Sequence, residues 1–205
     1  MTRSLGEVEA MAHKAARGAG YSWGMAEDAG AAVRWLEARG IRGCGALAKT
    51  LQTVDGQVTE FAPRSDWTSP SGRLCPIMVG AALSDRVDKN ASLGPVLAPV
   101  LLLPVLAFMS KTHGQPMYVE VGSGQAVLDG DAIELGTTLD DDASPVRIRT
   151  GAPHRPVVQA RPCQMRADVS DRSWALLDAF ATKTYAPATE ASRLKGAGAG
   201  LTDND

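Results

Sequence analysis

Cysteine and histidine, the residues that build disulfide frameworks and zinc sites, are scarce in this sequence. Its three cysteines lie at positions 44, 75 and 163, with no Cys-x-x-Cys spacing, and no two of its three histidines share a metal-ligand spacing. An odd number of isolated cysteines argues against a disulfide framework and against a structural zinc site. We therefore expect no metal site, and free thiols in the reducing environment of the cytoplasm.

The chain also lacks an excess of charge of either sign. Among its 205 residues, 21 Lys and Arg are balanced by 23 Asp and Glu, which gives a formal net charge of -2. A protein that attracts nucleic acid or an anionic membrane through its overall field needs a basic excess. We therefore expect neither nucleic acid nor a membrane among its partners.

A long apolar run of the kind that spans a membrane is missing as well. Residues 95–109 are apolar, but the run is shorter than the roughly 20 residues that a spanning helix needs and it contains three prolines. The polar start of the chain, MTRSLGEVE, lacks the apolar core of a signal peptide. We expect residues 95–109 to be buried core and the protein to be cytoplasmic.

Helical patterns fill the first quarter of the chain. Ser4 with Glu7 forms a capping box ahead of one helical run, and Ser22 is the predicted N-cap of a second. A third, shorter helix is predicted over residues 44–51. Together they predict a helical N-terminal lobe, residues 1–52, in which abundant alanine and glycine allow close helix packing.

The apolar middle of the chain is harder to assign. Residues 74–83 have the length of a strand, but their alanines also allow a helix, so the type of this element stays open. Residues 96–103 are predicted to be a buried strand. Residues 104–113 are predicted to be a helix with proline at its first position and glycine after its end.

Short β patterns follow, and a last helix is predicted before the C-terminal segment. Strands are predicted over residues 117–121, 125–128, 132–135, 146–149 and 157–163. Asp129-Gly130 is a hairpin signal between two of them, and Ser170 is the predicted N-cap of the last helix. We predict one α+β domain, residues 1–205, in which an α/β body (residues 53–205) with a mostly antiparallel central sheet follows the helical lobe and ends in a glycine-rich tail.

The C-terminal segment, residues 182–205, combines hydroxyl groups, a carboxylate and a guanidinium with closely spaced glycines. Backbone N–H groups of such glycines can approach an anion. The segment lacks the Lys-Ser/Thr of a P-loop and the flanking strand and helix of a dinucleotide-binding turn, so no nucleotide cofactor is expected. Two simpler interpretations stay open: a flexible tail, and a surface pair of Glu190 with Arg193.

Two blocks of the sequence carry a resemblance to a known family. Residues 15–30 (AARGAGYSWGMAEDAG) and residues 184–200 (TYAPATEASRLKGAGAG) resemble an uncharacterised proteobacterial family of about this length. The resemblance implies a soluble bacterial protein of one domain, with no activity to transfer. It also implies that Arg17, Trp23 and Glu27 share one site with the C-terminal block.

A second resemblance concerns residues 27–45, which are similar to the N-terminal helix of the malate and lactate dehydrogenase family that lacks a Rossmann fold. Where that family has Ser-His-Gly, this chain has Gly43-Cys44-Gly45. The acid–base histidine is thus absent, and the chain is much shorter than such enzymes. We therefore expect no nicotinamide binding.

Two functional hypotheses follow from these patterns. The first is a cofactor-independent isomerase, lyase or hydrolase that acts on a small anionic metabolite, with Tyr185, Glu190 and His154 moving protons. The simpler interpretation of His154 as an ordinary loop histidine stays open. Its substrate-binding residues would be Arg17, Trp23, Glu27, Thr189, Ser192, Arg193, Gly196, Gly198 and Gly200. The second hypothesis is a non-catalytic binding or accessory subunit that packs against a partner protein, and a homo-oligomer is also open.

Overall fold

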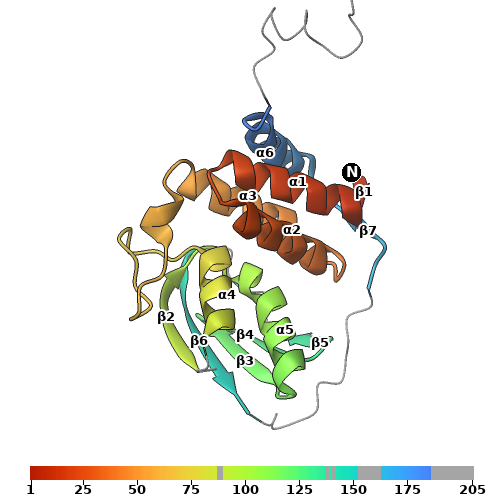
Figure 1. Ribbon diagram of the computed structural model, residues 1–205. Coiled ribbons are helices and arrows are strands. Elements are labelled where there is room, and N and C mark those ends of the chain that lie inside the picture. Colours follow the sequence, from red (N-terminus) through yellow and green to blue (C-terminus); the bar gives the residue numbers. More distant parts are fainter. Residues whose placement is uncertain (87–89, 137–138, 140–141, 152–162, 186–205) are drawn as a thin grey trace, which may run out of the picture.

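The computed structural model describes residues 1–86, 90–136, 139, 142–151 and 163–185 (Figure 1). In these ranges a layer of helices lies over one end of an antiparallel sheet, and two further helices cover one face of that sheet. The predicted α+β class, with helices at both ends of the chain and strands in the middle, is confirmed.

The helical layer consists of α1 (Leu5–Gly18), α2 (Trp23–Glu37), α3 (Gly43–Val54) and α6 (Asp171–Thr182). Three of these helices begin at the serines expected from the sequence. The side chains of Ser4, Ser22 and Ser170 each accept a hydrogen bond from a backbone N–H in the first turn of the helix that follows. Ser4 and Glu7 form the complete capping box.

Glycines bring the helices of this layer close together, as the composition predicted. A Cβ atom on Gly18 would lie 1.8 Å from the carbonyl oxygen of Phe180, and one on Gly30 would lie 3.0 Å from that of Glu9. The backbone of α1 therefore contacts the backbones of both α6 and α2, at separations that exclude any side chain between them.

The sheet consists of β2 (Ala91–Val96), β3 (Met117–Val121), β4 (Gly124–Asp129), β5 (Ala132–Leu135) and β6 (Ser144–Thr150), in the order β2-β6-β3-β4-β5. All its pairs are antiparallel, and the predicted Asp129-Gly130 hairpin joins β4 to β5. Gly130 has the positive φ of 57° that such a turn requires. Along β6, buried Val146 and Ile148 alternate with exposed arginines, as expected for a strand with one wet face.

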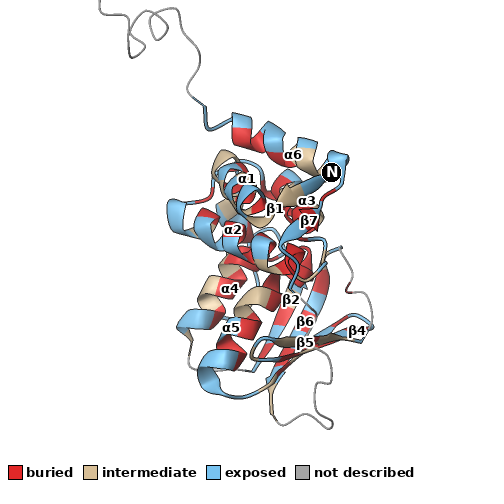
Figure 2. Cartoon of the chain, turned by 90° about the vertical axis from the view of Figure 1, so that its right-hand side faces the viewer, coloured by how far each residue is buried: buried red, intermediate tan, exposed pale blue. Residues whose placement is uncertain are grey.

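The apolar run that was open in type is helical. Residues Pro76–Asp85 form α4, with proline in the first turn. The predicted helix after it is α5 (Leu103–His113), which ends at Gly114 in the left-handed conformation. Both helices lie against the same face of the sheet, and the burial pattern of Figure 2 shows their buried sides turned toward it.

One strand prediction was wrong. Residues 96–103 are not a strand: β2 ends at Val96, and a 3-10 helix, η2 (Pro99–Leu102), leads directly into α5. Ala98 makes the turn between them with a φ of 37°. Every residue of this run is buried, so its composition alone did not distinguish a buried strand from a buried helix.

Three short elements were not predicted. β1 (Thr2–Ser4) and β7 (Arg166–Asp168) form an antiparallel pair that ties the start of the chain to the segment before α6, and η1 (Val58–Phe61) is a single 3-10 turn. The predicted strand over residues 157–163 lies outside the described residues except for Cys163, which is exposed and not in a strand.

A single hydrophobic cluster joins the helical layer to the sheet. It includes Val8 and Leu36 from the helical layer, Leu103 and Leu106 from α5, and Val119 from the sheet. Residues 95–109 are mostly buried in it, as predicted. No helix in the described ranges is long and apolar enough to cross a membrane.

Candidate functional site

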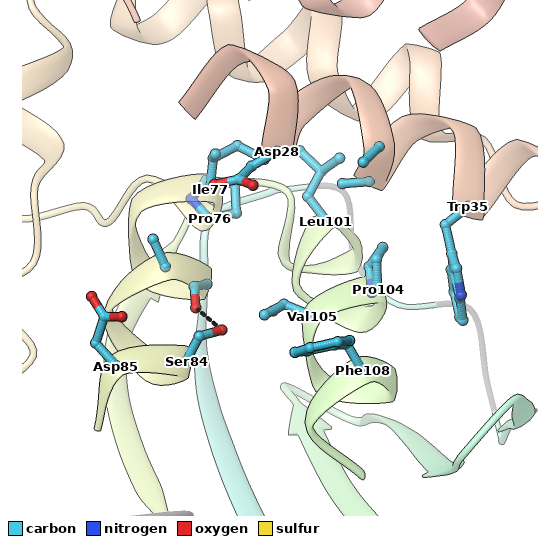
Figure 3. Close-up of a pocket in the computed structure, with 14 residues that line it drawn as sticks. Asp28, Trp35, Pro76, Ile77, Ser84, Asp85, Leu101, Pro104, Val105 and Phe108 are labelled. Atoms are coloured by element: carbon cyan, nitrogen blue, oxygen red, sulfur yellow. Dashed lines mark hydrogen bonds between the residues drawn. The ribbon is translucent and has the colours of Figure 1, made fainter. Parts of the chain in front are cut away.

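A groove with a volume of about 520 Å³ lies where α2 crosses the first turns of α4 and α5 (Figure 3). We call it the apolar groove. Its lining comes from three segments: Asp28, Ala31, Ala32 and Trp35 of α2, Pro76, Ile77, Gly80, Ala81, Ser84 and Asp85 of α4, and Leu101, Pro104, Val105 and Phe108 of η2 and α5.

The solvent exposure of the lining residues increases from the floor of the groove to its rim. Ile77, Gly80 and Leu101 are buried, whereas the Phe108 side chain on the rim is 63% exposed. A Cβ atom on Gly80 would lie 3.1 Å from Cγ1 of Val105, so α4 and α5 are in direct contact at the floor. The floor is therefore closely packed, while the rim presents a large aromatic ring to solvent.

Trp35 forms part of the lining and is held in place from its own helix. The guanidinium of Arg39, one turn later, lies 3.8 Å from the centre of the indole ring, and Arg39 Nη1 donates a hydrogen bond to the Trp35 carbonyl oxygen at 3.3 Å. A cation over an aromatic face restrains the ring. Trp35 is half-buried: part of it packs against the hydrophobic cluster and part lines the groove.

The polar groups of the groove are two carboxylates and one hydroxyl. The Ser84 hydroxyl donates to the Gly80 carbonyl oxygen at 3.1 Å, within α4. Asp28 lies beside the first turn of α4, and Asp85 lies at the opposite end of that helix (Figure 3). Among the residues that the structure describes, neither Asp28 nor Asp85 has an ion-pair partner.

Asp28 is an exposed residue whose surroundings still disfavour its charged form. Partial burial raises its pKa above the ordinary value, and the neighbouring charge of Glu27 raises it further. Both effects disfavour the ionised form, and a cation beside Asp28 would relieve both. No lysine or arginine stands among the lining residues given above.

The predicted site at the corner between α1 and α2 is only partly described. The guanidinium of Arg17 lies 4.5 Å from the ring centre of Trp23 and donates a hydrogen bond to the Tyr21 carbonyl oxygen. The ring of His13 lies 5.7 Å from that of Trp23, whose side chain is 65% exposed. Arg17 and Trp23 are thus brought together, and Glu27 is exposed one turn further along α2.

Of the predicted catalytic residues, the structure describes Tyr185 alone. Its side chain is 59% exposed, just beyond the end of α6. The other predicted residues lie outside the described ranges: His154, Thr189, Glu190, Ser192, Arg193, Gly196, Gly198 and Gly200. The anion-binding cluster therefore stays a prediction.

Gly43-Cys44-Gly45, the sequence that stands where the dehydrogenases have Ser-His-Gly, forms the first turn of α3. Its N-terminal N–H groups are capped by a side chain from another helix: the Cys44 N–H donates to Oε1 of Glu37 at 2.8 Å, and Glu37 is only 6% exposed. Burial raises the pKa of the Glu37 carboxyl, and burial together with Glu37 raises the pKa of the Cys44 thiol. Burial and the neighbouring Glu37 thus disfavour the thiolate form of Cys44.

A polar hollow of about 640 Å³ adjoins this helix end, lined among others by Arg42, Ser170 and Ser173. Within the described part of the chain, no three His, Cys, Asp or Glu side chains are grouped as ligands for a metal ion. The hollow is thus polar, and the described residues around it do not form a three-ligand metal site.

Comparison with known proteins gives one match. A family described as "Protein of unknown function (DUF3726)" has a model that matches residues 3–75, a stretch that contains α1, α2 and α3 and is shorter than half of the chain. A search of curated proteins found no match, and neither did a search of solved structures. The similarity to an uncharacterised family is thus confirmed for the helical N-terminal region.

The apolar groove was missed by the sequence reasoning. One signal for it existed: Asp28, Ala31, Ala32 and Trp35 have the spacing of a single helical stripe on α2, and Phe108 falls on an otherwise buried helix. The α2 wall lies more than forty positions before the other two walls in the sequence, and no local pattern shows that they meet.

Proposed function

We propose that this protein is a non-catalytic binding subunit whose apolar groove receives the apolar side chains of a partner protein. The observation that carries the proposal is the groove between α2, α4 and α5, with its exposed Phe108 rim. Grooves between helices commonly take the apolar face of a partner helix. Exposed apolar surface of this kind marks interaction sites in soluble proteins.

The energetics favour occupation of the groove. Burial of a Phe side chain contributes about 1.5–3 kcal/mol, and the half-buried rings and aliphatic groups beside it add to this. The close contact of Gly80 with Val105 and the restraint on Trp35 keep the groove in shape. A preformed site loses little conformational entropy when its partner binds.

The lining suits binding better than catalysis. Its polar side chains are Asp28, Ser84 and Asp85, and the Ser84 hydroxyl is engaged by the carbonyl oxygen of Gly80. Asp28 and Asp85 lie at opposite ends of α4, so they do not form an acid–base pair on a shared substrate atom.

Site-specific photo-cross-linking tests this proposal. A benzophenone amino acid replaces Phe108, and a control protein carries it at Arg172, an exposed position on α6 remote from the groove. In extracts of the cells from which the gene comes, we expect one protein, identified by mass spectrometry, to cross-link at position 108 and not at position 172. Excess unlabelled wild-type protein should compete for it, whereas the groove variant Ala31→Glu should not.

The same products at both positions, or none at position 108, would refute the proposal. Ala31 is exposed and glutamate is a good helix former, so this variant is expected to fold.

Most residues of the enzymatic hypothesis lie outside the described ranges, so it stays a prediction. It expects small carboxylates or phosphorylated metabolites to raise the melting temperature of the wild-type protein and Arg193→Ala to abolish the increase. A cytoplasmic bacterial location is part of our proposal for either function, and the unpaired state of Cys44, Cys75 and Cys163 supports a reducing compartment.

A further inference from the structure

We infer that the partner segment is an amphipathic helix that lies along α4 and α5 and carries a lysine or arginine beside its apolar face, and that this basic residue pairs with Asp28. The inference rests on the proposed function and adds the chemistry of the partner to it. Its basis is the position of two unpaired carboxylates at the two ends of the apolar groove.

Asp28 is placed to select a cation. It lies at the end of the groove where α2 meets α4, next to Glu27, and no basic side chain of the described residues pairs with either carboxylate. A basic residue brought in by a partner would meet the negative charges of Asp28 and Glu27, and among the described residues no lysine or arginine lines the groove. Charge complementarity of this kind determines which partners bind and in which orientation.

The second carboxylate, Asp85, determines how far apart the basic residues of the partner helix should be. Asp28 lies beside Pro76 and Ile77 at the start of α4, and Asp85 is the last residue of that helix. Nine residues of helix span about 13.5 Å at 1.5 Å per residue. Side chains on one face of a helix recur after seven or eight positions, which span about 10.5–12 Å. A partner helix parallel to α4 would therefore place its two basic residues seven or eight positions apart, and their long side chains would reach the two carboxylates.

The same charges argue against a second copy of this chain as the occupant. A copy that offered its own groove would bring another Asp28 and Asp85 against these carboxylates, and like charges at a contact oppose association. Two grooves are both concave, so the groove of a second copy would not fill this one. A convex apolar surface, such as one face of a helix, would fill it.

The test uses the partner segment recovered by cross-linking at position 108, synthesised as a peptide, and full-length protein. We expect the segment to contain two basic residues seven or eight positions apart. Asp28→Asn should weaken its binding about tenfold, and Asp28→Glu should retain most of it. The matched control Asp178→Asn removes an exposed carboxylate from α6 and should leave the affinity unchanged.

Exchanging the charges of Asp28 and its partner residue tests the proposed ion pair more specifically. Asp28→Lys should weaken binding of the natural peptide more than Asp28→Asn does. In a second peptide, glutamate replaces the basic residue that pairs with Asp28. This peptide should bind the Asp28→Lys variant better than it binds the wild-type protein. Raising the salt concentration should weaken the wild-type complex more than the Asp28→Asn complex, which keeps the pair with Asp85.

Each other outcome overturns the inference in an identifiable way. Equal affinity of the wild-type protein and Asp28→Asn would remove Asp28 from recognition while leaving the groove as a docking site. A cross-linked product of two copies of this chain would assign the groove to self-association. No protein cross-linked at position 108 would refute the proposed function itself.

Discussion

Glu37 is a buried carboxylate that caps a helix to which it does not belong. It accepts the Cys44 N–H at 2.8 Å at the start of α3, where the N-cap residue Arg42 supplies no side-chain bond. Burial raises its pKa. A carboxyl group with a raised pKa in the folded state holds its proton more firmly there than in the unfolded chain, so it stabilises the fold most when protonated.

We therefore predict that Glu37→Gln changes how stability depends on pH. In the wild-type protein the contribution of Glu37 is full below the ordinary pKa of 4.5 and declines as the pH rises through the raised value. Glutamine keeps an acceptor oxygen and does not titrate. Urea unfolding at a series of pH values should show the variant gaining stability relative to wild type as the pH rises above 4.5.

A difference in unfolding free energy that stays constant with pH, or that falls as the pH rises, would contradict this account of Glu37. Glu37→Ala serves as the control for the cap itself. It removes the acceptor, and we expect it to cost about 1–2 kcal/mol, the usual effect of losing a side-chain cap.

The sequence identified local caps and missed this distant one for a physical reason. Ser4, Ser22 and Ser170 bond to N–H groups three residues ahead, so their role is contained in a short window of sequence. Glu37 reaches α3 across a turn that includes Gly40, with a φ of 66°, and only the folded turn brings it there.

At the scale of elements, the contact between α1 and α6 depends on the absence of one side chain. The backbone of Gly18 approaches the carbonyl group of Phe180 so closely that a Cβ atom would lie 1.8 Å from its oxygen. Backbone atoms of a packed helix cannot move aside independently, so a larger residue must separate the two helices.

We predict opposite effects for two glycine substitutions in α1. Gly18→Ala should lower the free energy of unfolding by about 1–3 kcal/mol, as expected for overpacking of a close contact. Gly6→Ala, in the first turn, adds a methyl group where no atom lies within 4 Å, and should raise stability by about 0.5–1 kcal/mol. Chemical denaturation of both variants measures the two changes.

If both substitutions stabilise the protein, α1 does not pack on α6 at Gly18. Gly6→Ala has the same chemistry and the same helix, so it separates the general helix propensity of alanine from the specific contact.

Elements with a clear period and clear end signals were predictable. α5 has proline in its first turn and Gly114 at its end, and β6 alternates buried valine and isoleucine with exposed arginine. β2 was not recognised because Gly94 and Pro95 interrupt it, and its register shifts between Leu93 and Pro95. Glycine and proline are tolerated there because β2 is the edge strand of the sheet.

At the scale of the whole molecule, the helical layer and the sheet share one hydrophobic cluster, so the prediction of a single domain can be tested by its cooperativity. Leu36 of α2 and Leu103 of α5 belong to the same cluster as Val119 of β3. We expect one calorimetric transition, with a calorimetric enthalpy equal to the van't Hoff enthalpy. Two resolved transitions would show that the regions fold separately.

The site could not be predicted at this scale, although most of the fold could. The residues that attracted attention, from Thr189 to Gly200, are close in sequence, and a chemical motif within a short segment is visible without a structure. The apolar groove is assembled from three helices, and its central feature is apolar surface left uncovered after packing. In the sequence, Trp35 and Phe108 are apolar residues on helices, as core residues are. Only their position in the fold shows that they line an exposed surface.

The most direct measurement of the central claim is the affinity of the cross-linked partner for two matched variants of this protein. Ala31→Glu places a charged side chain in the apolar groove, and Ala179→Glu makes the same change at an exposed position of α6. If the groove is the docking site, calorimetric titration should show binding weakened at least about tenfold by Ala31→Glu, equal to about 1.4 kcal/mol, and unchanged by Ala179→Glu. Equal affinity of wild-type protein and the folded Ala31→Glu variant would contradict the assignment of the groove as the docking site.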